Sequence, residues 1–184
     1  ATQELTVRTL DHMMFRNVGG RFTATPLAAE TQQAPAFASA IADFDGDGAE
    51  DLFLGQHFFP TMIGMPRHDQ GRGLLLRGDG AGALTPLSAQ QSGIAVYGDQ
   101  RGAAYADFNR DGRLDLAVSQ NGDQTRLFEN RGARVGLRVR LRGPSGNPDG
   151  VGAQVRIVYG ATMGPVREVQ AGSGYWSQNG AVQL

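Results

Sequence analysis

Short apolar segments recur along the chain, and glycine-rich stretches separate them. Three segments show the short apolar runs or the period-two alternation that is typical of strands: Asp51–Gly55, Leu114–Val118 and Leu137–Arg142. Nowhere does a helical spacing of hydrophobic residues continue over about 11 residues. The 27 glycines are spread between the apolar segments, which favours many tight turns. The pattern therefore predicts an all-β protein.

A repeated unit organises the first part of the chain. Residues 42–56 and 106–120 align without gaps, 64 positions apart. Small residues precede both copies, so each copy predicts a strand, an acidic loop and a second strand. Hairpin-like segments accompany the copies at 14–22, 75–84 and, more weakly, 127–132. The two kinds of segment alternate in a fixed order.

The length of this repeat is typical of a β-propeller blade. A period near 60 residues with several short strands predicts a partial β-propeller of about two blades in residues 1–129. A closed ring needs at least about four blades, and the chain opens on the hairpin that would end a preceding blade. We therefore expect one of two arrangements. Either the chain is part of a longer protein with neighbouring blades, or copies in a homo-oligomer cover the open sheet edges.

Charge and composition divide the chain and exclude several kinds of chemistry. Residues 1–129 hold 10 arginines against 16 acidic residues, whereas residues 130–184 hold 7 against 2, which predicts a separate small C-terminal β domain. The net charge of −1 argues against a nucleic-acid partner, and no apolar run approaches the roughly 20 residues of a membrane span. Cysteine and lysine are absent, which excludes thiolate and amine nucleophiles.

The two acidic loops share the pattern DxDxDGxxD, with asparagine for the second aspartate in the later copy. Carboxylates at alternate positions of a tightly curled loop point inward, and a backbone carbonyl at position 7 adds another oxygen. Such a cage of oxygen atoms suits a hard cation of calcium size. The sequence therefore predicts two calcium sites, with ligands from Asp43, Asp45, Asp47, Ala49 and Asp51 in the first loop and from Asp107, Asn109, Asp111, Arg113 and Asp115 in the second.

The alternative is that each loop is an acidic surface turn, since aspartate and glycine are favoured in turns. Crowded carboxylates repel one another unless a cation lies among them, and two matching copies in equivalent contexts favour the metal. Because Asn109 keeps an oxygen but carries no charge, we expect the second site to be the weaker one. Calcium would be structural, and extracellular modules bind it at about 0.1–1 mM. This affinity favours a secreted, periplasmic or cell-surface location.

Position 12 of each loop distinguishes the motif from an EF-hand. An EF-hand needs a carboxylate there and helices on both sides, but the residues are Leu54 and Val118, both in predicted strands. The nine-residue loop between strands resembles that of FG-GAP/VCBS-type β-propeller repeats, the family that includes integrin α-subunit propellers. Both copies match the family pattern at every ligand position.

The C-terminal residues resemble a second family. Asn147, Val151–Val155, Arg167–Val169 and Gly172–Gln178 match elements of the ASPIC/UnbV domain, which ends cartilage-acidic-protein-like and bacterial VCBS-repeat proteins. Together the two resemblances imply a secreted, calcium-stabilised scaffold used for binding or cell adhesion, with a protein or glycan partner and no catalytic activity. The alternative is an accessory region of a larger secreted enzyme, for example a carbohydrate-active one.

Other residues leave alternatives open. One predicted strand face carries Arg138, Arg140 and Arg142. It is either a docking surface for a polyanion or an acidic partner, which the acidic first module could itself supply, or a solvated outer face. The segment His57–His68 suits partner recognition, packing over the exposed end of its own blade, or packing against a neighbouring blade. Tyr175 and Trp176 would stack on a sugar or pack in a core. The three histidines form no metal-binding or catalytic pair in the sequence, so we expect no enzyme.

Overall fold

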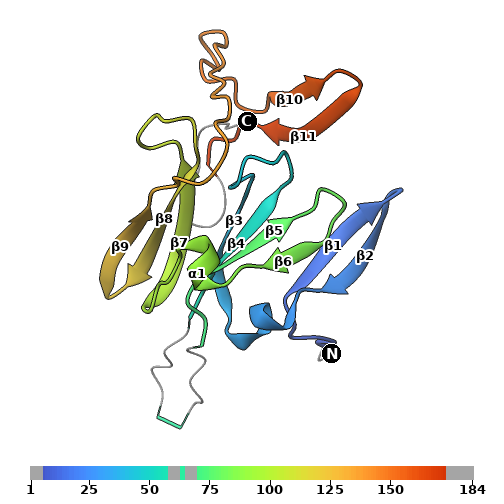
Figure 1. The fold of residues 1–184 in the computed structure, drawn as a ribbon. Helices are drawn as coiled ribbons and strands as arrows, with labels where there is room; N and C mark the ends of the chain where they lie inside the picture. Colours follow the sequence, from blue (N-terminus) through green and yellow to red (C-terminus); the bar gives the residue numbers. More distant parts are fainter. Residues whose placement is uncertain (1–5, 58–62, 65–69, 173–184) are drawn as a thin grey trace.

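The computed structural model describes residues 6–57, 63–64 and 70–172. Within them the chain forms antiparallel strands joined by loops (Figure 1). The strands are β1 (Met13–Val18), β2 (Arg21–Pro26), β3 (Ala36–Ala42), β4 (Asp51–Gln56), β5 (Leu74–Gly78), β6 (Leu84–Pro86), β7 (Asp99–Ala106), β8 (Asp115–Asn121), β9 (Asp123–Phe128), β10 (Gln154–Tyr159) and β11 (Thr162–Glu168). A 3-10 helix, Ala29–Gln33, and one helical turn, α1 (Ala89–Ser92), complete the described elements. The prediction of an all-β fold is confirmed.

The described strands form separate antiparallel sheets rather than one closed sheet. β3–β4–β5–β6 make a four-stranded sheet and β7–β8–β9 a three-stranded sheet, while β1–β2 and β10–β11 are isolated hairpins. Each larger sheet begins with a strand, an acidic loop and a second strand, as the repeat predicts. The register repeats as well, because Leu52 faces Leu76 in one sheet and Leu116 faces Phe128 in the other.

Small residues on β3 allow the two larger sheets to pack closely. Ala38, Ala40 and Ala42 alternate with exposed positions along β3, and all three are buried. They form one hydrophobic core with Phe44 and Phe53 of their own unit and with the buried residues of the second unit, Ala103, Leu116 and Val118. Side chains at alternate strand positions share one face, so this alanine face brings β7 against β3.

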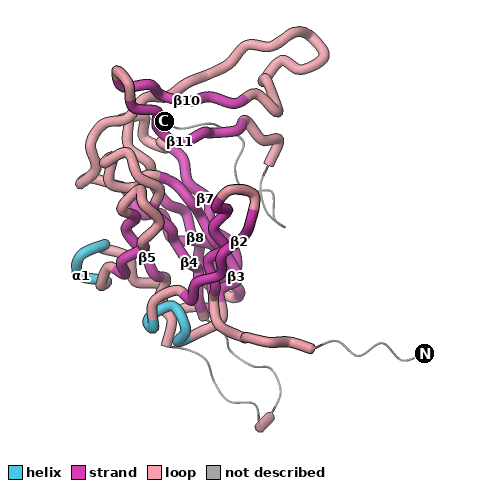
Figure 2. The backbone as a smooth tube through the Cα atoms, turned by 90° about the vertical axis from the view of Figure 1, so that its right-hand side faces the viewer, coloured by secondary structure: helices cyan, strands magenta, loops and turns pink. Residues whose placement is uncertain are grey.

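The acidic loops lie at the same end of their sheets. The β3–β4 and β7–β8 connections both face the C-terminal hairpin β10–β11, which lies beyond that end of the sheets in two perpendicular views (Figures 1 and 2). The N-terminal part of the described chain lies at the opposite end (Figure 2). This arrangement places both loops next to the C-terminal part of the chain.

The structure corrects one predicted strand. Leu137–Arg142 is irregular apart from a single bridge residue at Arg138, although its hydrophobic and basic residues alternate perfectly. Alternation provides two chemically different faces, but a strand also needs a neighbour for its backbone hydrogen bonds. Among the described residues, no strand pairs along this stretch. Arg138, Arg140 and Arg142 are all exposed.

The remaining predictions have different outcomes. The hairpins predicted at 14–22 and 75–84 are present as β1–β2 and β5–β6. The weaker one at 127–132 is wrong, because β9 ends at Phe128 without a fourth strand in the described part of that sheet. Most of His57–His68 and the pair Tyr175–Trp176 lie outside the described residues. The partial propeller and the domain boundary at 129/130 stay predictions.

Candidate metal centre

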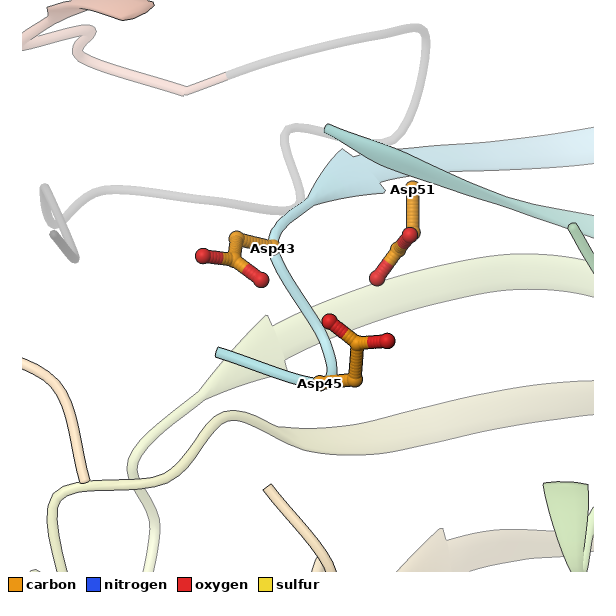
Figure 3. A group of neighbouring side chains, drawn as sticks. All are labelled: Asp43, Asp45 and Asp51. Carbon is orange, nitrogen blue, oxygen red and sulfur yellow. The ribbon is translucent and has the colours of Figure 1, made fainter. Parts of the chain in front are cut away.

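Three carboxylates of the first loop converge. Asp43 follows the last residue of β3, Asp45 lies in the loop, and Asp51 begins β4. One oxygen of each carboxylate lies within 4.8 Å of the others, and Figure 3 shows the three groups turned toward a common space. Within the described part of the chain, these three carboxylates are the acidic side chains that lie close enough together to bind one metal ion.

Backbone amide groups hold the Asp43 carboxylate in position. One of its oxygens accepts hydrogen bonds from the N–H groups of Gly46 (2.7 Å) and Asp47 (3.1 Å), and the other accepts one from Gly48 (2.8 Å). These bonds curl the loop around the carboxylate, as in an Asx turn. Gly46 and Gly48 both have positive φ angles, +74° and +92°, which the tight curl requires.

Asp51 anchors the end of the loop. It is 2 % exposed, and its two oxygens accept hydrogen bonds from the N–H groups of Phe44 (2.8 Å) and Gly78 (2.9 Å). Burial raises the pKa of the Asp51 carboxyl, and the charges of Asp45 and Asp43 raise it further, while the two backbone hydrogen bonds lower it. Asp51 therefore links the loop to β5 and also carries a buried charge beside two other carboxylates.

The second loop repeats this hydrogen-bond frame. Asp107 accepts from the N–H groups of Asp111 (2.9 Å) and Gly112 (3.2 Å), as Asp43 does from Asp47 and Gly48. Asp115, at the start of β8, accepts from Phe108 (3.0 Å) and Asn130 (2.8 Å), as Asp51 does from Phe44 and Gly78.

The backbone of the two loops also follows the same path. Arg110 and Gly112 have positive φ angles at the positions that correspond to Gly46 and Gly48. The repeat seen in the sequence is thus a repeat of backbone geometry.

The position-5 aspartates lie apart from the converging group. The Asp47 side chain is not a member of the three-carboxylate group, and one of its oxygens accepts the Ala49 N–H (2.8 Å). Asp111 correspondingly accepts the Arg113 N–H (2.9 Å) and pairs with the Arg113 guanidinium (3.2 Å). The burial of Asp111 opposes the bonds from Arg113 and Asn109, and the net effect lowers its pKa.

The second loop has only two carboxylates at the positions that converge in the first, Asp107 and Asp115, because Asn109 takes the place of Asp45. Metal ligation by the Asn109 side chain and by the carbonyl groups of Ala49 and Arg113 stays a prediction.

Basic residues from outside the loop contact the first site. Arg77 on β5 pairs with Asp45 (2.7 Å), and Arg167 on β11 pairs with Glu50. Burial lowers the pKa of the Arg167 guanidinium, while the nearby Asp43 carboxylate opposes this shift. Neither arginine belongs to the aspartate pattern that predicts the loops.

Comparison of the chain with protein-family models, with curated proteins and with solved structures finds no match. Among the described residues, no helix is both long enough and apolar enough to cross a membrane. The site itself therefore carries the functional argument. It offers a hard cation three converging carboxylates, a set of oxygen ligands that magnesium, manganese and calcium all accept.

Proposed function

We propose that this chain is a calcium-stabilised, non-catalytic binding scaffold of FG-GAP/VCBS type, in which both acidic loops bind calcium. One observation carries the proposal: the two loops, 64 residues apart, hold their first and ninth residues in the same frame of backbone hydrogen bonds. The first loop also gathers three carboxylates within reach of a single ion.

The donor set fits calcium. The converging atoms are all carboxylate oxygens, which are hard ligands, and calcium accepts a larger and more variable coordination shell than magnesium, which demands a near-ideal octahedron. Asp43, Asp45 and Asp51 would hold the ion in the first loop. Asp107, Asn109 and Asp115 occupy the corresponding positions in the second, where the neutral Asn109 weakens the attraction. The ion would neutralise the carboxylates and fix the turn between two strands.

The calcium affinity indicates the location of the protein, and exposed hydrophobic side chains indicate a binding role. A structural site with an affinity of about 0.1–1 mM is filled in extracellular fluid, whereas cytosolic calcium would leave it empty. We therefore propose a secreted, periplasmic or cell-surface scaffold that binds a protein or a glycan. The exposed hydrophobic side chains of the β1–β2 hairpin, Phe15, Val18 and Phe22, support a binding role, since such residues favour contact with another surface.

Isothermal titration calorimetry of the purified chain with calcium tests this proposal. We expect two binding events, with the tighter dissociation constant near 0.1 mM and the weaker one within about tenfold of it. Asp43→Asn should remove or greatly weaken the tighter event and Asp107→Asn the weaker one. Asp11→Asn removes the same charge outside both loops and should leave both events unchanged. Absence of calcium binding at millimolar concentrations would contradict the proposal.

A further inference from the structure

A single side chain connects the two acidic loops. The Asn130 amide nitrogen donates hydrogen bonds to the carbonyl oxygen of Phe44 (2.7 Å), between Asp43 and Asp45, and to that of Leu114 (3.1 Å), next to Asp115. The Asn130 backbone N–H donates to Asp115 itself (2.8 Å). The Asn130 side-chain oxygen is also used, because it accepts the N–H groups of Gly132 (3.2 Å) and Ala133 (3.1 Å). Asn130 thus uses its side-chain amide, its side-chain oxygen and its backbone N–H at the junction of the two loops.

The residues that follow Asn130 strengthen this connection. The Arg134 N–H donates to the carbonyl oxygen of Asp45 in the first loop (3.1 Å), and the Gly136 N–H donates to that of Gly112 in the second (2.7 Å). The segment also lies close to both loops. A Cβ atom on Gly46 would come within 2.8 Å of the Arg134 backbone, and one on Gly112 would collide with Val135. We call residues 130–136 the bridging segment.

The bridging segment has a consequence for ion binding. Without an ion, repulsion between carboxylates favours a more open and more mobile loop. An ion that orders one loop also orders the bridging segment bonded to it, so the conformational entropy of that segment is already lost when the second ion binds. The second loop then loses less conformational entropy when it binds its ion, so its affinity is higher. The effect is reciprocal, because a coupling free energy between two binding sites acts equally in both directions.

We propose that Asn130 is a positioning residue that couples the two loops, so that calcium in either loop increases the affinity of the other. This inference rests on the proposed function, since it requires both loops to bind calcium. It adds that the two sites are cooperative and that the route runs through the bridging segment. A coupling of the usual size would change each affinity by about fivefold or more.

The test measures the calcium affinity of the first loop with the second loop intact and with it disabled by Asp107→Asn. NMR amide signals separate the loops, because the N–H groups of Gly48 and Gly112 donate to Asp43 and Asp107 respectively. The titration adds calcium ions and no other ligand. We expect Asp107→Asn to weaken binding at the first loop by about fivefold or more in the otherwise unchanged chain.

Asn130→Asp removes the amide donors and keeps the oxygen that caps Gly132 and Ala133. In this variant the effect of Asp107→Asn on the affinity of the first loop should fall well below fivefold, and the remaining coupling would run through the Arg134 and Gly136 bonds. The added negative charge of the variant acts on the first loop equally in both backgrounds, so it largely cancels in the comparison of the two affinities. Asn130→Ala is the second variant if Asn130→Asp does not fold. Asn17→Asp is the matched control, because Asn17 caps Gly20 in the β1–β2 turn within the same Phe-x-Asn-x-Gly pattern, and coupling should persist there.

The outcomes separate this inference from the proposed function. If neither loop binds calcium, the proposed function fails and the inference with it. If both loops bind calcium but Asp107→Asn leaves the affinity of the first loop unchanged, only the inference is overturned. If coupling exists and keeps its full size in both Asn130 variants, the role of Asn130 is refuted. Loss of coupling in Asn17→Asp would also refute the proposed route.

Discussion

Asp51 combines two roles, and removing its carboxylate should destabilise the fold even when no metal is present. In Asp51→Ala, the N–H groups of Phe44 and Gly78 lose their acceptor in a buried environment. A hydrogen bond to a charged group contributes about 1.5–3 kcal/mol. The lower end applies here, because burial disfavours the charged form of Asp51 and raises its pKa. Two such bonds predict a loss of about 3 kcal/mol in the free energy of unfolding.

Urea denaturation in excess chelator measures this loss without a contribution from calcium. Asp47→Ala is the control, because Asp47 is exposed and the hydrogen bond that its carboxylate accepts from Ala49 lies on the loop surface. We expect Asp47→Ala to cost less than about 1 kcal/mol under the same conditions. The difference between the two variants therefore isolates the buried anchor. If Asp51→Ala were no more destabilising than Asp47→Ala in chelator, the assignment of Asp51 as the structural anchor would be refuted.

Three further outcomes are expected. Adding chelator to the chain in 1 mM calcium should lower the melting temperature by about 4–11 °C, and scanning calorimetry measures the shift. The tighter site contributes about 1.4 kcal/mol at this concentration and the weaker one about 0.4–1.4 kcal/mol. Gly46→Ala should lower the free energy of unfolding by about 1–3 kcal/mol more than Gly19→Ala does, as measured by urea denaturation. Both glycines have positive φ angles, but only Gly46 lies against Arg134. Equal losses in the two variants would contradict this contact. Arg167→Gln breaks the ion pair with Glu50, so it should accelerate amide hydrogen exchange in β10–β11. The exchange rates in the β3–β6 sheet should stay unchanged. Unchanged exchange in β10–β11 would argue against the ion pair.

The strands that the sequence predicted correctly are those with a local signal and an available partner. Asp51–Gly55 and Leu114–Val118 follow acidic turns that return the chain antiparallel to the preceding strand, so each finds its neighbour nearby. Leu137–Arg142 shows a clearer alternation but is irregular apart from the bridge residue Arg138, and none of the described strands pairs along it. Alternation alone therefore does not decide strand formation, which depends on tertiary pairing.

The acidic residues of the candidate site were visible in the sequence, but their neighbours were not. The spacing of the aspartates identified both loops, since alternate residues of a curled loop share one side. The contacts of Arg77, Asn130 and Arg167 with the loops arise from tertiary structure. Asn130 lies 86 residues after Phe44, and no local pattern indicates that its amide reaches the first loop. Such contacts are set by how the two units pack through β3 and β7.

The central claim is that both loops bind calcium, and crystals grown in millimolar calcium test it most directly. Anomalous difference density collected at a long wavelength should show one strong peak among Asp43, Asp45 and Asp51 and a second, weaker peak among Asp107, Asn109 and Asp115. Oxygen atoms should surround each peak at about 2.3–2.6 Å, the usual calcium distance. Well-ordered loops without anomalous density at either position would contradict the account.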